Sequence, residues 1–183
     1  MIRRIFSVII FALLVFGCVS CTGGVEDSGL VIITVKNFHK VRDTLYRSAQ
    51  PADDQWDELE ALGIRSVISL RYFTPGPDDV GSAAIAAYAL PWRTDKIDED
   101  DLAAFLKLYN EAEKPVLVHC YHGSDRTGAA VAAYRVVFEN YLPEEAADEL
   151  VNGGFGHHEF VYRNIPKLIR NADYDSLKEK LTE

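Results

Sequence analysis

Residues 115–128 combine a thiol, a guanidinium and a run of backbone amides in the sequence Pro-Val-Leu-Val-His-Cys-Tyr-His-Gly-Ser-Asp-Arg-Thr-Gly. The apolar residues 116–118 precede Cys120, and a continuous apolar run of this kind is typical of a central strand buried on both faces. An Ala- and Val-rich segment with helical spacing begins at Thr127. The pattern predicts a strand, a tight loop and a helix, with the thiol at the end of the strand and Arg126 at the start of the helix.

Such an arrangement is suited to binding an oxyanion and attacking it with a nucleophile. Loop amides and the positive end of a helix dipole converge on one point, and Gly123 allows the backbone to turn its amides inward. A bound phosphate would also meet the bidentate fork of Arg126. The same positive groups would favour the thiolate of Cys120, which is the form that attacks phosphorus. His119, Cys120 and His122 do not have the spacing of a zinc site, because adjacent strand residues point in opposite directions and no second pair of ligands follows.

The signature His-Cys-x5-Arg-Thr resembles that of the cysteine-dependent protein tyrosine phosphatases, and in particular their small dual-specificity branch. This resemblance implies a phosphocysteine intermediate on Cys120, with Arg126 holding the phosphoryl oxygens and the Thr127 hydroxyl assisting the departing thiolate. It also implies that His119 orients the loop from behind, and that no metal or other cofactor is needed. The substrate phosphate would contact the loop residues Tyr121, His122, Gly123, Ser124, Asp125 and Arg126.

Expelling an alkoxide or phenoxide from phosphorus requires a general acid, and the attacking thiolate cannot also serve as that acid. In the family, an aspartate just upstream of the helix that precedes the His-Cys strand does this work. Asp95 and Asp98 both fall in that region; Asp95 ranks first, because Asp98 is placed to cap the helix. Asp125 is similar to the loop aspartate of myotubularin-like lipid phosphatases and is a third candidate. His122 and Asp125 also make the loop less basic than in inositide phosphatases that use loop lysines.

The elements that must position these residues alternate between strand and helix. Apolar and β-branched runs predict strands at 30–35, 64–70, 86–92 and 116–118. Apolar residues at helical spacing, with Pro near the start of two segments and Gly after the end of one, predict helices at 53–62, 99–112, 127–140, 143–150 and 160–169. A charged, frayed tail is predicted at 174–181. The order indicates an α/β fold, with a central, mostly parallel sheet of four to five strands flanked by helices, as in dual-specificity phosphatases, and with the site at the carboxyl ends of the strands.

Residues outside the loop extend the resemblance to roughly 44–170. The segment Tyr-Arg-Ser-Ala-Gln-Pro is similar to one that recurs upstream in bacterial and fungal members of this branch, so Arg47 and Gln50 either border the pocket or have structural roles. Arg71 resembles a strand-end Arg of the family, and we expect it to form a structural ion pair. His157 and His158, after a Gly-Gly-Phe-Gly stretch, either face the site or serve packing or capping.

The amino-terminal segment has the pattern of a secretory signal. Residues 1–21 contain a basic start, an apolar run too short to span a membrane comfortably, and two cysteines. Cys18 and Cys21 each resemble the processed cysteine of a bacterial lipoprotein, with Cys21 preferred; an ordinary cleaved signal and an uncleaved anchor are the alternatives. Residues 22–29 predict a flexible tether, and 30–183 one phosphatase domain. We therefore expect an exported, lipid-anchored protein on the periplasmic side of a bacterial cell envelope.

The charge balance restricts the partners. The chain has 19 basic and 28 acidic residues, and removing Arg3 and Arg4 with the leader leaves 17 basic against 28 acidic residues. This balance argues against nucleic acid and against broad attraction to anionic lipid surfaces. Two of the three cysteines lie in the leader, so the domain keeps Cys120 alone and can form no internal disulfide. We expect a monomer that contacts the membrane only through its leader or lipid.

The sequence therefore predicts a phosphomonoester hydrolase of the tyrosine or dual-specificity protein phosphatase type. One alternative is a phosphatase of inositol phosphates, phosphoinositides or another small phosphate ester, which an exported location favours slightly. A non-catalytic phosphate-binding module is disfavoured, because Cys120, Arg126 and Thr127 are all present. Rhodanese-type sulfur transfer is also disfavoured, since the Arg-Thr-Gly helix start suits phosphate.

Overall fold

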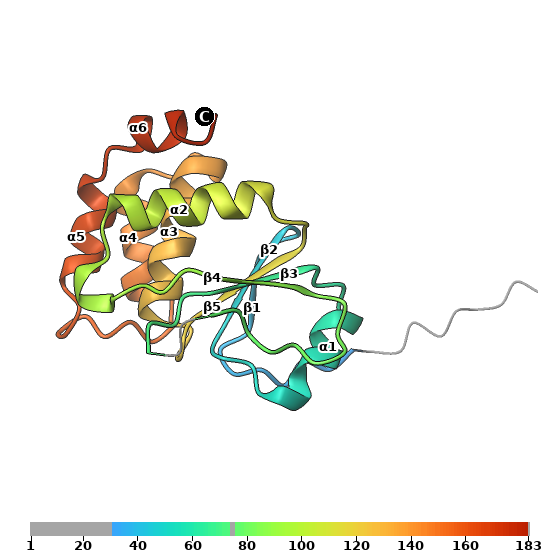
Figure 1. Cartoon of the computed structure of the whole chain (residues 1–183). Helices are drawn as coiled ribbons and strands as arrows, with labels where there is room; N and C mark the ends of the chain where they lie inside the picture. The colour runs from blue at the N-terminus through green and yellow to red at the C-terminus, as the bar shows by residue number, and fades with distance from the viewer. Residues whose placement is uncertain (1–30, 74–75, 183) are drawn as a thin grey trace, which may run out of the picture. The chain divides into compact units, whose positions relative to one another are not determined.

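Five short strands form one sheet in the order β1-β2-β5-β3-β4, as the computed structural model shows (Figure 1). The strands are β1 (His39–Arg42), β2 (Leu45–Ser48), β3 (Ser66–Ser69), β4 (Ala86–Ala89) and β5 (Val116–His119). β1 pairs with β2 antiparallel, and all other pairs are parallel. The predicted α/β class with a mostly parallel sheet is thus confirmed.

The structure describes residues 31–73 and 76–182, which belong to one unit, Val31–Glu183. The predicted signal peptide and tether, residues 1–29, lie outside the described residues. Within the part that is described, no helix has both the length and the apolar composition needed to cross a bilayer.

β5 occupies the centre of the sheet, and its four residues, Val-Leu-Val-His, are all buried. Its apolar side chains alternate between two cores, with Val116 and Val118 in the larger one and Leu117 in the smaller one. The parallel register places His119 beside Ser48 of β2 and Ser69 of β3. Three strands therefore end at the same level, where the chain enters the loop that carries the thiol.

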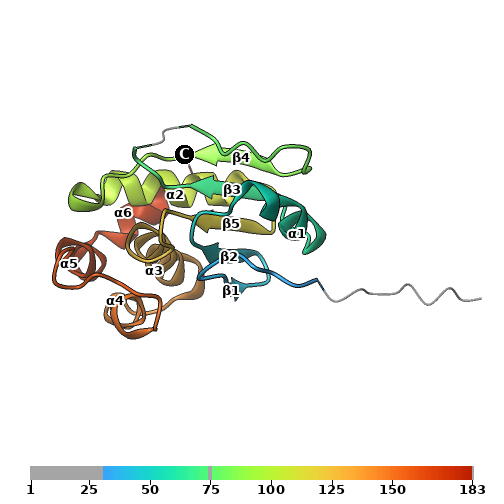
Figure 2. The same ribbon diagram turned by 90° about the horizontal axis from the view of Figure 1, so that it is seen from below.

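Helices cover the two faces of the sheet unequally (Figures 1 and 2). The face with the smaller core is covered by the 3₁₀ turn η1 (Asp53–Gln55) and α1 (Trp56–Ala61). The face with the larger core is covered by α2 (Glu99–Glu111), α3 (Asp125–Glu139), α4 (Pro143–Asn152), α5 (Asn164–Asn171) and α6 (Tyr174–Glu179). A 3₁₀ turn, η2 (Thr94–Lys96), precedes α2. α3 is the most deeply buried helix, because its small residues 129–133 lie against the sheet and the other helices.

The strand predicted at 30–35 is wrong, since the described residues of that range form no strand. Val35 is buried beside α1, and the Thr34 amide donates to Glu58 Oε1 at 2.8 Å. The apolar residues thus reflect packing against a helix and not strand pairing. The edge strand β1 is instead polar and largely exposed, which explains why no apolar pattern revealed it.

The carboxyl-terminal predictions were correct in part. The helix predicted at 160–169 begins only at Asn164, and Phe160 and Val161 are exposed before it. The predicted frayed tail contains α6, which buries Tyr174 and Leu177 and is capped by the Asp173 side chain.

Candidate active site

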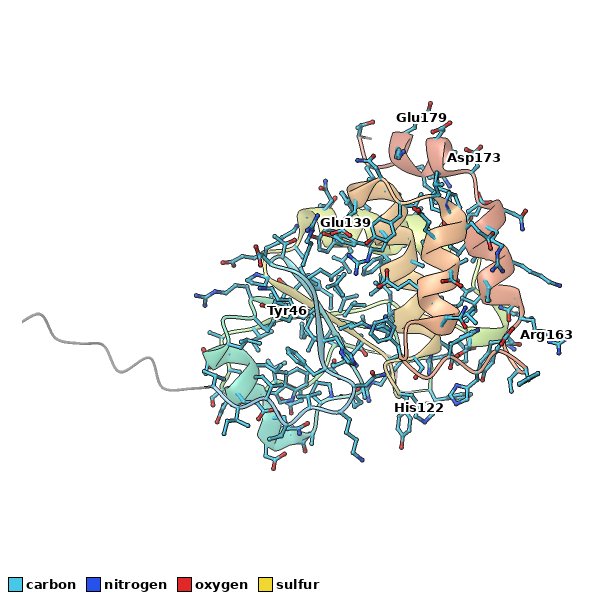
Figure 3. The ribbon with its side chains drawn as sticks, turned by 180° about the vertical axis from the view of Figure 1, so that it is seen from behind. Tyr46, His122, Glu139, Arg163, Asp173 and Glu179 are labelled. Carbon is cyan, nitrogen blue, oxygen red and sulfur yellow. The ribbon has the colours of Figure 1, made fainter. Side chains whose placement is uncertain are left out.

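The loop from Cys120 to Ser124 joins the end of β5 to the start of α3. Cys120 is only 2% exposed, whereas Tyr121 and His122 are exposed. The Tyr121 carbonyl accepts a hydrogen bond from the Gln50 amide at 3.2 Å, which ties the loop to the segment after β2. Figure 3 shows His122 at the end of the molecule away from Glu139, the last residue of α3, so the loop lies at the amino end of that helix.

Gly123 makes the turn of the loop possible. Its φ angle is +73°, and a β-carbon there would lie 2.5 Å from the carbonyl atoms of Ser48. Arg47, fully buried at 1% exposure, donates from Nη2 to the Gly123 carbonyl at 2.8 Å and lies 3.8 Å above the ring centre of Phe155. Burial lowers the pKa of Arg47 to about 10. Arg47 is therefore a structural support of the loop, one of the two roles that the sequence left open.

His119 contacts a buried carboxylate that the sequence did not identify. Its Nε2 lies 2.7 Å from Asp78 Oδ2, and the other Asp78 oxygen accepts from Arg71 at 2.7 Å and from Gln50 at 3.2 Å. Burial opposes the charged carboxylate, but these partners hold the pKa of Asp78 below its ordinary value. The ion pair expected of Arg71 is confirmed, and Gln50 takes part in the same network.

The first turn of α3 presents two buried polar groups that have no partner among the described residues. These are Arg126 Nε and the Thr127 hydroxyl. Arg126 Nη1 donates to the Leu70 carbonyl at 3.1 Å, which holds the guanidinium at the carboxyl end of β3. Buried polar groups are nearly always hydrogen-bonded. Phosphoryl oxygens would supply partners for both groups, and the predicted phosphate site fits this observation.

Two cavities meet at Arg126, of about 360 Å³ and about 420 Å³. Both are lined by Tyr72, Phe73, Thr94, Arg126 and Tyr162. The smaller cavity extends to Arg71, Tyr121, His122, Asp125, His158 and Val161. The larger cavity extends to Arg93 and Asp95. A ligand held by Arg126 would therefore meet aromatic walls and a different set of titratable side chains on each side.

The structure separates the three general-acid candidates. Asp95 is exposed on η2, 2.9 Å from Arg93, whose hydrogen bond lowers the pKa of Asp95. Asp98 caps α2 as expected, because its carboxylate accepts from the Asp101 amide at 3.0 Å. Only Asp95 of these two lines a cavity with Arg126.

Asp125 is 6% exposed, and both of its carboxylate oxygens are engaged. Oδ1 accepts from the His158 amide at 2.9 Å, and Oδ2 lies 2.8 Å from His158 Nδ1. His157 Nδ1 lies 2.8 Å from Oδ1, but its direction is poor for a hydrogen bond. Burial opposes ionisation, yet the contacts with His157 and His158 lower the pKa of Asp125 from 3.8 to about 2.

Two supporting residues were missed by sequence reasoning. Asp78 follows Pro77 in a loop that carries no recognisable signal, 41 residues from its partner His119. Asn37 adopts a left-handed conformation with φ of 53°, and its amide donates to the carbonyls of His122 and Phe155 at 3.0 and 3.1 Å. An Asn in a polar segment is a weak signal of such a backbone position. Among the described residues, no cluster of His, Cys, Asp or Glu suits a metal ion.

Comparison with known proteins agrees with this geometry. The tyrosine phosphatase family matches residues 32–149. The dual specificity protein phosphatase TpbA of Pseudomonas aeruginosa is 34% identical over 146 residues, which are 78% of this chain and 65% of the relative. The inositol diphosphatase DSP5 of Arabidopsis thaliana is 31% identical over 136 residues, 68% of this chain and 65% of that protein. This chain thus spans slightly less than two thirds of the length of these relatives.

Solved structures show the same fold. The crystal structure of P. aeruginosa TpbA superposes with a TM-score of 0.71 at 32% identity, covering 81% of this chain and 92% of that one. A second crystal structure holds a variant of that protein in complex with pTyr. The catalytic core of Siw14, at 21% identity and a TM-score of 0.64, shares the fold. The chain belongs to the tyrosine phosphatase family, in its bacterial dual-specificity-like branch.

Proposed function

We propose that this protein is a cysteine-dependent phosphomonoester hydrolase that acts on phosphotyrosine. One observation carries the proposal: the nucleophile loop places a buried thiol next to a helix start whose Arg126 Nε and Thr127 hydroxyl lack partners among the described residues. A phosphoryl group bound by the loop amides and Arg126 would satisfy these atoms. The same groups stabilise the negative charge that develops on the equatorial oxygens.

The proposed reaction proceeds in two displacements. The Cys120 thiolate attacks phosphorus, an S–P bond forms, and the P–O bond to the leaving group breaks. Asp95 gives its proton to the departing oxygen, for which it must first separate from Arg93. Water then displaces Cys120 as a thiolate, which the Thr127 hydroxyl stabilises, and inorganic phosphate is released.

The cavity walls favour an aryl phosphate. Tyr72, Phe73, Tyr121 and Tyr162 border the space next to Arg126, and such rings provide apolar area for a substrate ring. The pTyr complex of the related P. aeruginosa protein supports the same choice. A cavity with several aromatic walls suits one phosphate on an aromatic ring better than a densely charged inositol.

Inositol phosphates are the second candidate substrate class, and the plant inositol diphosphatase relatives favour them. Against this class, the loop has no lysine, and Asp125 adds a negative charge beside the phosphate site. Repulsion between that carboxylate and additional phosphates would weaken their binding.

We also propose that the protein is exported and lipid-anchored on the periplasmic side of the envelope, and that it works as a monomer. The basic start, the apolar run and the cysteines within residues 1–21 support export. The membrane contact would then be made through the leader or its lipid alone.

The test is phosphate release by residues 28–183 in the presence of EDTA and a reductant. The panel contains a phosphotyrosyl peptide, a phosphoseryl peptide, p-nitrophenyl phosphate, inositol phosphates and phosphoinositides. We expect the phosphotyrosyl peptide to have the highest kcat/KM, and Cys120→Ser to abolish turnover while retaining phosphate binding. Activity that is highest on inositol phosphates selects the second candidate, whereas silence on every substrate would contradict catalysis.

A further inference from the structure

Asp125 is a buried carboxylate at the phosphate loop that the proposed mechanism does not use. It opens α3 directly before Arg126, and its side chain faces the segment that follows the Gly-Gly-Phe-Gly stretch. Both of its oxygens are engaged by His158, and these contacts are not open to a leaving group. The same contacts favour the ionised carboxyl, since the pKa of Asp125 is lowered to about 2 against the effect of burial. Its role must therefore be sought in the groups that it holds.

His158 is the group that Asp125 orients. The carboxylate receives both the backbone amide of His158, at 2.9 Å, and Nδ1 of its ring, at 2.8 Å. An ionised carboxylate only accepts hydrogen bonds, so Nδ1 carries a proton, and Nε2 is the ring nitrogen that can take up a further one. A carboxylate that fixes the tautomer and direction of an imidazole in this way is a known device for preparing a base.

The free nitrogen belongs to a ring that borders the smaller cavity. The His158 side chain is 49% exposed and lines the 360 Å³ cavity together with Arg126. The rings of His122 and Tyr162 flank it, with centroids 5.8 Å and 6.4 Å away. No described residue forms a hydrogen bond with His158 Nε2, which leaves this atom available to water or ligand in the cavity.

Asp95 and His158 approach Arg126 from different cavities. Asp95 lines the larger cavity and not the smaller one, and His158 lines the smaller cavity and not the larger one. The two chemical steps also need proton transfer in opposite directions, first to the leaving group and then from water. Two carriers on two sides of Arg126 can divide these tasks.

We propose that His158, oriented by Asp125, is the general base that activates water for hydrolysis of the phosphocysteine. This inference rests on the proposed function. The water oxygen forms a bond to phosphorus, the P–S bond breaks, and its electron pair leaves with Cys120 as a thiolate. The proton of the attacking water passes to His158 Nε2, and hydrogen phosphate is released. His158 is then the catalytic residue, and Asp125 is a positioning residue that acts through it.

If His158 had only a structural role, its loss would have different kinetic consequences from the loss of a general base. If the Asp125 contacts served only to fasten residues 157–158 to α3, loss of His158 would disturb the loop and slow both chemical steps together. A base for the second step leaves formation of phosphocysteine intact and slows its decay. The two steps can be observed separately, because p-nitrophenolate is released in the first.

The experiment is stopped-flow turnover of p-nitrophenyl phosphate by the wild type and His158→Asn. The side-chain amide of Asn takes the place of His158 Nδ1 and can still donate to Asp125, so the loop keeps its anchor. We expect a burst of nearly one p-nitrophenolate per active site, followed by a steady-state rate about 100-fold below wild type. Phosphocysteine should accumulate and be visible by intact mass. Glu159→Gln, a change at the next, exposed residue, is the matched control and should behave as wild type.

Imidazole provides the second readout. In His158→Ala, added imidazole should enter the space next to Arg126 and speed the decay of phosphocysteine in proportion to its concentration. This rescue also serves if His158→Asn is poorly folded, since imidazole can restore the decay of phosphocysteine only in an intact site. A burst rate that falls as much as the steady-state rate, or decay that imidazole leaves unchanged, would overturn the role of His158. Absence of Cys120-dependent turnover in the wild type would instead overturn the proposed function.

Discussion

Gly123 lies so close to Ser48 that a β-carbon at this position would stand 2.5 Å from both the carbonyl carbon and the carbonyl oxygen of Ser48. The backbone at the end of β2 therefore packs directly against the phosphate loop and restricts the conformations that the loop can adopt. Arg47, the preceding residue of the same strand, reinforces this contact by donating to the Gly123 carbonyl. Arg47 and Ser48 both belong to the segment Tyr-Arg-Ser-Ala-Gln-Pro. Sequence analysis singled out this segment but left its role open.

Gly123→Ala should impair both stability and activity. The left-handed φ of +73° costs an alanine about 1 to 2 kcal/mol, and the clash with Ser48 adds about 1 to 3 kcal/mol of overpacking. Relief of the clash requires movement of the loop, and misplacement of a reacting group by about 1 Å costs on the order of 100-fold in rate. Urea denaturation and kcat/KM on p-nitrophenyl phosphate measure the two effects.

Gly154→Ala is the matched control for this prediction. Gly154 has a φ of +82°, yet a β-carbon there meets no atom within 4 Å. This variant should show only the conformational cost of about 1 to 2 kcal/mol, with kcat retained. Equal losses in the two variants would show that contact with Ser48 does not shape the loop.

Asp95→Asn should affect substrates according to their leaving groups. A poor leaving group such as phenoxide needs the proton that Asp95 would supply, so kcat for phenyl phosphate should fall on the order of 100-fold. The fall should be much smaller for p-nitrophenyl phosphate, whose leaving group departs readily as an anion. Asp98→Asn, which alters the cap of α2, should cost about 1 kcal/mol of stability and leave both rates near wild type. A uniform fall for both substrates would place Asp95 outside the proton transfer.

Asp125 should make stability depend on pH in the acid range. Its pKa is lower in the folded protein, about 2, than the ordinary 3.8, so its contribution is fully present above pH 3.8 and is lost as the pH falls toward 2. The shift corresponds to about 2 kcal/mol. Asp125→Asn should thus be less stable than wild type by about 2 kcal/mol near neutral pH, and the difference should shrink with acidification. Denaturation of both proteins at several pH values tests this, and a difference that stays constant would contradict it.

Much of the fold follows from the sequence because burial leaves a periodic trace. The continuous apolar run of β5 and the Ala-rich spacing of α3 predicted the strand, the helix and the loop between them. The cap at Asp98 was equally visible, since it depends on neighbours a few residues away. These features are local, and local chemistry determines them.

The supports of the loop were harder to predict because they join distant segments. Asp78 meets His119 only after β3 and β5 have paired, and Asn37 meets His122 across the end of the sheet. Neither contact depends on spacing along the chain. The strand predicted at 30–35 failed for a related reason, since an apolar residue buried by a helix looks like one buried in a sheet.

Asp78→Asn tests whether this distant support matters for the site. The carboxylate and His119 are almost fully buried, at 2% and 0% exposure of their side chains, and Arg71 shares the same carboxylate. Removing one partner of a buried pair typically costs about 3 to 5 kcal/mol, and because Asn keeps one acceptor oxygen we expect about 2 to 3 kcal/mol.

Activity should fall together with stability in Asp78→Asn, because His119 leads directly into Cys120. Asp79→Asn is the matched control: Asp79 is exposed, and among the described residues its carboxylate accepts a hydrogen bond only from the nearby Gly81 amide. Loss of this carboxylate should change stability by about 0.5 kcal/mol or less. Urea denaturation and kcat/KM on p-nitrophenyl phosphate, measured for the two variants, test the contrast. If Asp78→Asn matched Asp79→Asn in both measurements, the Asp78 carboxylate would not support the loop, whose shape would then depend on its other contacts, those with Asn37, Arg47 and Ser48.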